Sequence, residues 1–252
     1  MAYTLYLVHF QLPRNGLMDL NAIPRPSMII GSLSGDGSVL LSTLFLDIGS
    51  NNIDRTFSGV LQDSGGMSKS GSGTLTLSGA STYGGGTAVN AGTLIVANQS
   101  GSGTGTRSVA VNGGTLGGGG TITGPVTVGT GSGSGATLQP SFGASRKVTL
   151  TIQSLLTFKS DATYSFRLKS RRAEVVTNGV TIEGGAQFVL NAPQRKMPAG
   201  NTATLISNTS ATAISGTFAN LPDGGTITSG SNSFQANYEG GDGNDLTLTV
   251  LP

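Results

Sequence analysis

Short runs in which apolar and polar residues alternate recur along most of the chain. Residues 74–77, 148–152 and 246–250 all place an apolar side chain at every second position. A period of two predicts β-strands with one buried face, and the Gly, Asn and Ser residues that flank the runs predict tight corners. Long stretches of good helix formers such as Ala, Leu, Glu and Lys are missing, so the pattern predicts an all-β chain.

The runs recur in a register that can be read from the sequence. In each unit a small or polar residue, most often Thr, precedes an apolar residue, at intervals of roughly 13 to 26 residues. A unit of this size cannot bury its apolar face alone, and stacking the units buries a continuous core. The register residues are Ser38, Thr56, Thr74, Thr93, Thr115, Thr137, Thr163, Gln187, Thr204 and Thr217.

Two architectures accommodate such short strands. A meandering β-sandwich joins alternating strands by turns, whereas a parallel β-solenoid stacks equivalent residues of successive coils. The recurring register and the isolated apolar positions favour the solenoid, whose core is thin. We expect about ten coils over residues 28–252, each advancing about 4.8 Å, and an atypical N-terminal strand and linker over residues 1–27. The predicted core residues are Leu75, Leu77, Leu94, Val96, Leu116, Ile122, Val126, Val128 and Leu138.

Composition excludes several classes of protein. The 252 residues include 41 Gly, 10% charged residues, one His, and no Cys or Trp. A disulfide scaffold, a thiolate zinc site and a site with two His ligands are therefore excluded. The net charge is only +2 and basic residues occur at most in adjacent pairs, so we expect no nucleic-acid partner. No apolar run approaches the roughly 18 residues of a membrane-spanning helix, and we expect no membrane span.

Both ends of the chain carry strand-prone segments. Residues 3–10 are mostly apolar, but no Lys or Arg precedes them and no small-residue cleavage site follows, unlike a secretory signal. We expect a chain that begins inside a longer protein, or export that uses other information. Residues 245–251 are expected to form an exposed C-terminal edge. The N-terminal strand either covers its own first coil or joins a neighbouring subunit, which would produce head-to-tail filaments.

One segment has a recognisable order of residues. From Gly73 to Val96 the chain reads Gly-Thr-Leu-Thr-Leu-Ser-Gly, then a Thr-Tyr-x-Gly-Gly turn, then Val-Asn-x-Gly-Thr-Leu. This order resembles the autotransporter-associated β-strand repeat of large bacterial surface and secreted passenger domains. The resemblance extends over about residues 29–139, and Ser81 stands where the family usually has Asn. It implies a right-handed β-helix at a bacterial surface.

A calcium site is one interpretation of the segment from Gly240 to Asp245. Its sequence, Gly-Gly-Asp-Gly-Asn-Asp, resembles the calcium-binding nonapeptide of secreted β-rolls, in which carbonyl and carboxylate oxygens bind the cation. Such sites are shared between successive coils, but this sequence has one copy, and the aliphatic Leu246 falls one position early. A polar corner before the last strand is the favoured interpretation, and we expect no metal site and no cofactor.

Groups suited to catalysis are sparse. Residues 71–135 contain no Asp or Glu. Glu174 and Glu183, near two arginines, are the one pair that we consider for acid–base catalysis, and solvated corner charges are the alternative. His9 lies outside the repeat, so no serine nucleophile has an evident partner. We therefore predict no catalytic residues and no enzyme.

The sequence thus predicts a structural or adhesive β-helix of a bacterial surface layer, stalk or filament. The alternatives are a polysaccharide-active enzyme or a glycan-binding module on the same fold. Clustered acids would favour the enzyme and aromatic platforms the module, but the chain has no Trp and five scattered Tyr. Surface glycans and further copies of the chain are the expected partners. The glycosylation sequons at Asn98 and Asn208 are not expected to be modified in a bacterial protein.

Overall fold

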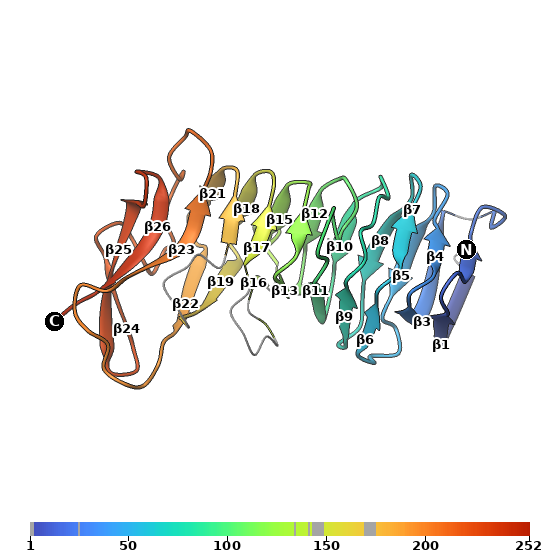
Figure 1. Cartoon of the computed structure of the whole chain (residues 1–252), viewed down its shortest axis with the longest axis horizontal. Helices are drawn as coiled ribbons and strands as arrows, with labels where there is room; N and C mark the ends of the chain where they lie inside the picture. The colour runs from blue at the N-terminus through green and yellow to red at the C-terminus, as the bar shows by residue number, and fades with distance from the viewer. Residues whose placement is uncertain (1–2, 25, 134, 141, 143–148, 169–174) are drawn as a thin grey trace.

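A computed structural model of the chain describes all residues except 1–2, 25, 134, 141, 143–148 and 169–174. The regular elements of the described residues are all β-strands, and they stack into an elongated solenoid with the two termini toward opposite ends (Figure 1). The predicted parallel β-solenoid is therefore confirmed. It has about 8 turns, slightly fewer than the ten expected.

Each coil has three faces, and strands of the same face pair in parallel with those of the neighbouring coils. The first face contains β5 (Phe45–Ile48), β8 (Gly66–Lys69), β10 (Thr87–Val89), β12 (Val109–Val111), β15 (Val126–Val128), β18 (Leu156–Phe158) and β21 (Val180–Ile182). The second face contains β6 (Arg55–Phe57), β9 (Thr74–Leu77), β11 (Thr93–Val96), β13 (Gly114–Gly118), β16 (Ala136–Gln139), β19 (Ala162–Arg167) and β22 (Gln187–Asn191). The long strand β3 (Ser27–Gly35) pairs with both β5 and β6 and so joins the two faces.

The third face is divided into two sheets. The first sheet contains β2 (Leu17–Asp19), β4 (Ser38–Leu40) and β7 (Val60–Gln62). The second contains β14 (Thr121–Ile122), β17 (Leu150–Ile152), β20 (Val175–Thr177) and β23 (Thr202–Asn208). Between them the coils lack regular strands but keep backbone hydrogen bonds, from Thr82 N–H to the Leu61 carbonyl and from Gly103 N–H to the Thr121 carbonyl. The third face therefore continues through the middle of the stack.

The N-terminal segment, expected to be a strand and linker outside the repeat, stacks on the first coil. Strand β1 (Tyr3–Leu12) pairs in parallel with β3, and β2 pairs in parallel with β4. The pairing thus begins before residue 28. It uses backbone groups, which every residue except proline supplies in full, so it needs none of the Thr-Leu and Gly signature that marks the later coils.

The C-terminal region changes from parallel to antiparallel pairing. Strand β26 (Asp245–Val250) lies between β23 and β25 (Asn232–Gly240), and β24 (Thr226–Ser229) is the outermost strand of this sheet. The prediction that residues 245–251 form the exposed edge is therefore wrong. Alternation with a period of two is the same in parallel and antiparallel strands, so the sequence pattern did not reveal the reversal.

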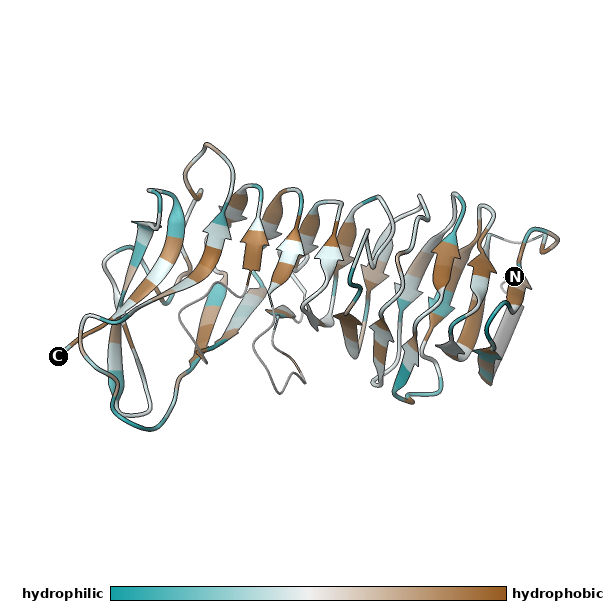
Figure 2. Ribbon diagram, in the orientation of Figure 1, coloured by the Kyte–Doolittle hydropathy of each residue, from teal (hydrophilic) through white to brown (hydrophobic). Residues whose placement is uncertain are grey.

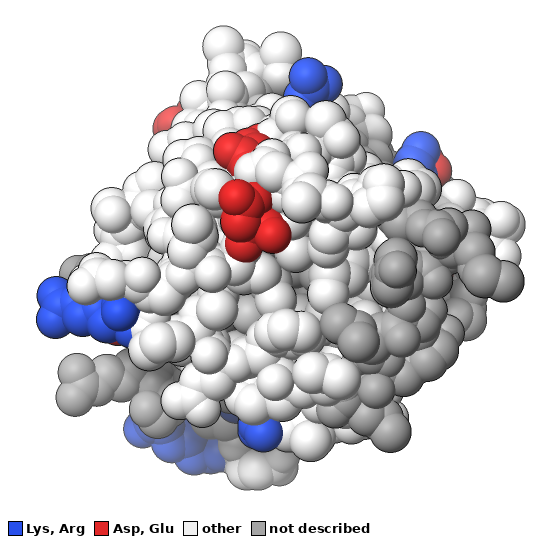
Figure 3. All heavy atoms as spheres, turned by 90° about the vertical axis from the view of Figure 1, so that its right-hand side faces the viewer, with Lys and Arg blue, Asp and Glu red and all other residues white. Residues whose placement is uncertain are grey.

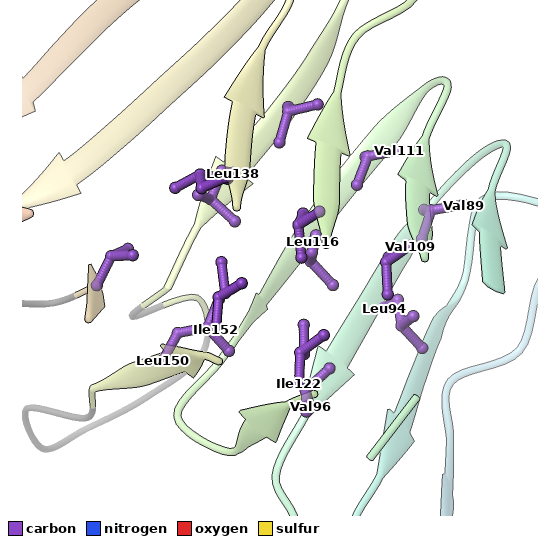
Figure 4. Packing of buried hydrophobic residues seen from close by; sticks show 14 of the residues in the cluster. Val89, Leu94, Val96, Val109, Val111, Leu116, Ile122, Leu138, Leu150 and Ile152 are labelled. Carbon is purple, nitrogen blue, oxygen red and sulfur yellow. The ribbon is translucent and has the colours of Figure 1, made fainter. Parts of the chain in front are cut away.

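The core consists of apolar columns that run through the stack. On the second face Leu75, Leu94, Leu116 and Leu138 occupy equivalent positions in successive coils, and the column continues through Tyr164. Figure 4 shows Leu94, Leu116 and Leu138 following one another, and strongly hydrophobic positions lie mainly on the strands (Figure 2). All nine predicted core residues are buried, with at most 2% exposure. Each buried Leu or Val contributes about 1.5–3 kcal/mol to stability.

The predicted register is correct in the central coils. Thr74, Thr93, Thr115, Thr137, Thr163 and Gln187 occupy equivalent positions in successive strands of the second face. The register is wrong nearer the ends: Thr56 pairs with Thr76, two positions along, and Ser38 lies on the third face. Thr204 lies in the part of β23 that pairs antiparallel with β26, and Thr217 lies outside the strands, so neither continues the column of the second face.

Candidate functional site

The outer surface of the second face carries a shallow groove with a volume of about 390 Å³. Strands β6, β9 and β11 of successive coils form its floor. Its lining residues are Arg55 and Thr56 of β6, Thr74 and Thr76 of β9, and Ile95 of β11, with Asp54 and Phe142 at the margins. Because these strands are neighbours in the sheet, the groove crosses the strands and runs along the solenoid axis.

The hydroxyl groups of the groove follow from strand alternation. In β9 the side chains of Leu75 and Leu77 are buried, so Thr74 and Thr76 point outward. Thr74 is the first member of an outward column that continues along the face with the threonines of β11, β13, β16 and β19. The same residues that mark the repeat in the sequence therefore form an outward column at the spacing of the coils, in which Thr93 is buried and the other members are partly exposed.

Phe142 closes one end of the groove. Its N–H donates a hydrogen bond of 3.0 Å to the carbonyl oxygen of Gln139, directly after β16. The ring can lie against the sheet because the outward position of β13 is Gly117. A Cβ atom at that position would be 3.0 Å from the Cβ of Phe142 and 2.6 Å from the Gln139 oxygen. Gly117 thus interrupts the row of outward side chains, and the space it leaves allows the ring of Phe142 to form an end wall of the groove.

One acidic and one basic residue stand at the other end. Asp54 Oδ1 accepts a hydrogen bond of 2.6 Å from the Thr74 N–H, and Arg55 Nη1 donates one of 2.9 Å to the Asp54 carbonyl oxygen. Within the described part of the chain, the one ion pair joins Lys159 to Glu183. The guanidinium of Arg55, which has five N–H donors, is therefore not neutralised by a described carboxylate.

A second, smaller cavity of about 160 Å³ lies beneath the C-terminal sheet. Leu168, Phe234 and Leu248 contribute to a mainly apolar wall, and Arg195 lies at its margin. The buried amide of Asn232 fixes the loop over it by accepting from the Met197 N–H and donating to the carbonyl oxygens of Pro193 and Arg195. This cavity is too small for an extended ligand.

Lys69 is an unusual member of the core. Its Nζ donates hydrogen bonds to the carbonyl oxygens of Ser70, Gly71 and Ala91, and the residue is 1% exposed. Burial lowers the pKa of the amine to about 8, against the opposing effect of the Asp47 and Asp54 carboxylates. An amine with a shifted pKa is a candidate nucleophile or base. Here the three carbonyl partners and the burial make it a structural tie that a substrate does not reach.

Of the acidic pair considered for catalysis, only Glu183 lies among the described residues. Glu183 Oε1 is 2.5 Å from the Nζ of Lys159 on the neighbouring coil, in a half-exposed ion pair. Glu174 and its two neighbouring arginines lie outside the described residues. Glu183 is thus a partly exposed charge with a basic partner.

The suspected calcium segment has a structural role. Asp245 is buried, and its Oδ1 accepts a hydrogen bond of 2.8 Å from the N–H of Asn208, which joins β26 to the end of β23. Burial raises the pKa of this carboxyl, the bond from Asn208 lowers it, and the nearby Asp242 raises it further. No cluster of three or more potential metal-ligating side chains occurs among the residues described by the structure.

The remaining sites singled out in the sequence are also occupied by structural contacts. His9 Nδ1 lies 2.9 Å from the Ser32 hydroxyl, and Nε2 lies 3.2 Å from that of Ser34. The sequon residues Asn98 and Asn208 are buried, and both side-chain amide groups donate to nearby carbonyl oxygens. The described residues form strands and loops, and no helix among them is long and apolar enough to cross a membrane.

Sequence reasoning did not identify Asp54, Arg55 and Phe142 as neighbours of one groove. Phe142 is an isolated aromatic residue in a segment rich in Gly and Ser, which was the one available signal. Phe142 packs over Gly117 of β13, and this contact follows only from the way in which the coils stack. The charged pair and the ring come from coils far apart in sequence, and stacking brings them together.

Comparison with known proteins identifies one part of the chain. Residues 67–96 match the family described as the passenger-associated-transport-repeat. These residues run from β8 to β11 and include the segment whose residue order resembled a passenger repeat. A comparison with curated proteins gave no match. A comparison with solved structures gave none either.

The repeat and the fold agree. The matched residues span more than one coil, from Met67 on the first face to Val96 on the second face of the next coil, and the neighbouring strands continue their register. The chain is therefore a β-solenoid that contains one match to the passenger-associated-transport-repeat, and both its fold and this repeat fit an autotransporter-associated β-helix repeat protein.

Proposed function

We propose that this chain is an extracellular structural element of a bacterial surface, a stalk or filament segment that also has an adhesive role. The supporting observation is the unbroken pairing of the strands, from β5 to β21 on the first face and from β6 to β22 on the second. A passenger-type repeat supports a place at the cell surface, and repeats of this kind are typically structural.

The geometry explains how such an element would carry load. Each coil contacts mainly its two neighbours, so stability is the sum of local interfaces along the axis. The inter-strand hydrogen bonds lie along that axis, and tension between the two ends is opposed by these bonds and by the buried columns. Coils should then detach one after another from an end, while the rest of the stack keeps its structure.

Single-molecule pulling between the chain ends tests the stalk role. A released coil of roughly 20 residues adds about 70 Å of extended chain, so we expect a series of steps of about this size. One all-or-none event, or extension without resistance, would contradict a load-bearing role. Labelling of intact producing cells with an antibody against the folded chain tests the location, and labelling only after lysis would contradict it.

We also propose that the chain associates with further copies of itself. The described surface at the end of the solenoid formed by the first coil is mostly uncharged (Figure 3). Most of its visible acidic side chains gather in one patch, and Lys and Arg lie near the margins. Val8 and Leu17 expose 39% and 58% of their surface in this coil. Strand β1 lies on its own first coil, as the capping alternative expects, and its outer backbone edge can pair with a strand of a second copy.

Sedimentation measured over a range of concentrations tests this association. We expect larger species at higher concentration, and their loss in Val8→Lys and Leu17→Lys, because a charge opposes edge pairing. A partly exposed threonine in the middle of the first face, changed in Thr157→Lys, provides the control. A wild-type chain that stays monomeric throughout would exclude the association. Deleting residues 1–12 should lower stability if β1 serves as a cap.

A further inference from the structure

We propose that the groove on the second face binds a linear oligosaccharide. The inference rests on the adhesive part of the proposed function, whose ligand class it names, and does not depend on the stalk part. It follows from the direction of the groove, from the mixture of groups that line it, and from the poorer fit of other classes of ligand.

The shape of the groove fits an extended chain. Its floor comes from β6, β9 and β11, and its aromatic end wall packs over Gly117 of β13, which is the next strand of the sheet. Four strands at about 4.8 Å span about 15 Å along the axis. An occupant would therefore lie across the strands and meet one coil after another, as several linked sugar rings do.

The lining has the two kinds of surface that a sugar presents. The hydroxyls of Thr56, Thr74 and Thr76 can each donate and accept, which suits the hydroxyls on the edges of a sugar ring. Ile95 and the ring of Phe142 form the apolar part, which suits the C–H face of the ring, and an aromatic face attracts such positively polarised hydrogens. Apolar surface combined with a few placed polar groups is typical of small-molecule sites.

The charged end adds orientation. Arg55 has donors beyond its bond to the Asp54 carbonyl, and a carboxylate such as Asp54 can accept more bonds than the one from Thr74. A carboxylate can accept two sugar hydroxyls, and a guanidinium can donate to hydroxyls or bind an acidic sugar through two bonds. This end therefore holds polar sugar edges, and Phe142 holds an apolar face at the opposite end.

Other ligand classes fit less well. A peptide added as a strand needs a free backbone edge, but β9 and β11 already pair on both sides within the sheet. A nucleic acid needs several cations, and here one Arg stands beside one Asp. A lipid chain needs a continuous apolar surface, whereas threonine hydroxyls divide this groove. The oligosaccharide is the class that uses all of the lining groups.

Titration of the full chain with three hexasaccharides tests the proposal: cellohexaose, chitohexaose and hexagalacturonate, followed by ligand-observed NMR and calorimetry. We expect saturable binding of at least one probe, with millimolar affinity or better. Phe142→Ala should weaken it about tenfold, because an aromatic contact is lost. Arg55→Ala should weaken the binding of hexagalacturonate more than that of the two neutral hexasaccharides if the guanidinium binds a sugar carboxylate. It should weaken the binding of all three probes to the same extent if the guanidinium donates to sugar hydroxyls only.

Phe45→Ala is the matched control. Phe45, like Phe142, is a phenylalanine packed over a glycine of a neighbouring coil, here Gly66, but it lies on the first face, away from the groove. Its removal should leave binding unchanged, and thermal melting should show that both variants are folded. No binding of any probe, or equal loss in Phe142→Ala and Phe45→Ala, would overturn the proposal. Pulling experiments are independent of this result, so the stalk role can stand or fail separately.

Discussion

The Nζ atom of Lys69 lies 3.3 Å from the carbonyl oxygen of Ala91, so that a side chain of one coil holds a corner of the next. In its column of the first face Lys69 occupies the position between Ile48 and Val89. An amine that is satisfied by three carbonyl oxygens thus replaces an apolar side chain within the core. The presence of this amine in the core ties two coils together, but it makes the stability of the fold depend on the charge of one buried group.

Stability should therefore rise with pH in alkaline solution. The pKa of Lys69 is about 8 in the folded chain, below its ordinary value of 10.5, because burial disfavours the charged amine. Between these values the unfolded chain holds more protons, so the free energy of unfolding increases as pH rises. Chemical denaturation from pH 8 toward 10.5 should show this increase in the wild type and lose it in Lys69→Met. Burial raises the pKa of Tyr83 in both proteins, so its effect cancels in the difference.

The column on the second face should not tolerate a charge. Leu94 is fully buried between Leu75 and Leu116, and Leu94→Asp would leave an unpaired carboxylate in the core. We expect a loss of several kcal/mol, or no folding. Ile95→Asp is the matched control, because this neighbouring side chain faces outward in the same strand. Thermal melting of the two variants measures the difference, and similar melting temperatures would show that the assigned register is wrong.

Replacement of Gly118 should destabilise the fold. Gly118 has a φ of 107°, and a Cβ atom there would lie 2.1 Å from the carbonyl oxygen of Val96. Gly118→Ala should cost about 1–3 kcal/mol from the backbone conformation alone, and the contact with the neighbouring coil adds to it. Gly184→Ala is the control, since nothing lies within 4 Å of the position its Cβ would take. Urea denaturation should separate the two variants clearly.

Asp161 should make the chain sensitive to acid. Desolvation opposes ionisation of this carboxyl, but hydrogen bonds from the backbone N–H groups of Gly131, Thr130 and Gly133 and from the Thr130 hydroxyl together lower its pKa below the ordinary value of 3.8. A lowered pKa gives stability that is present above 3.8 and is lost as pH falls through the folded value. Asp161→Asn should reduce this acid dependence in melting curves. Asp36→Asn, on a distant corner, should retain it.

A calcium chelator should not change the melting temperature. Asp245 is buried and already accepts a backbone hydrogen bond from Asn208, so its role is to join two strands. A bound cation would stabilise the folded chain by mass action, and its removal would lower the melting temperature. A fall of several degrees on addition of the chelator would restore the calcium interpretation of residues 240–245. Addition of excess calcium to a chelator-treated sample provides the control.

Much of the solenoid could be predicted because coil stacking imposes a rule on each position. Thr93 and Thr115 face outward and Leu94 and Leu116 face inward in equivalent strands, so the pair Thr-Leu recurs wherever the second face has its regular form. The N-terminal coil lacks this signature because its pairing with β3 depends on backbone groups. Its place in the stack could not be inferred from side-chain pattern.

The same reasoning could predict neither the antiparallel direction of the C-terminal strands nor the presence of the groove. Asp245–Val250 alternates like a parallel strand, and the antiparallel partners that reverse the pairing leave no separate mark in the alternation. The groove depends on the distance between Phe142 and the outer surface of β11, which is set by coil stacking and by the missing side chain at Gly117. A single sequence reveals the faces of strands better than the loops that overhang them.

The paired threonines also indicate how such a protein can change over time. Thr93 and Thr115 are farther apart in the sequence than Thr74 and Thr93, yet each pair occupies neighbouring positions on the same face. Extra residues are accommodated in the corner loops, so the length of a coil can vary without disturbing its neighbours. Duplication of one coil would lengthen the rod by a fixed increment, while its loop acquired new contacts. Reach and recognition can thus evolve independently in this molecule.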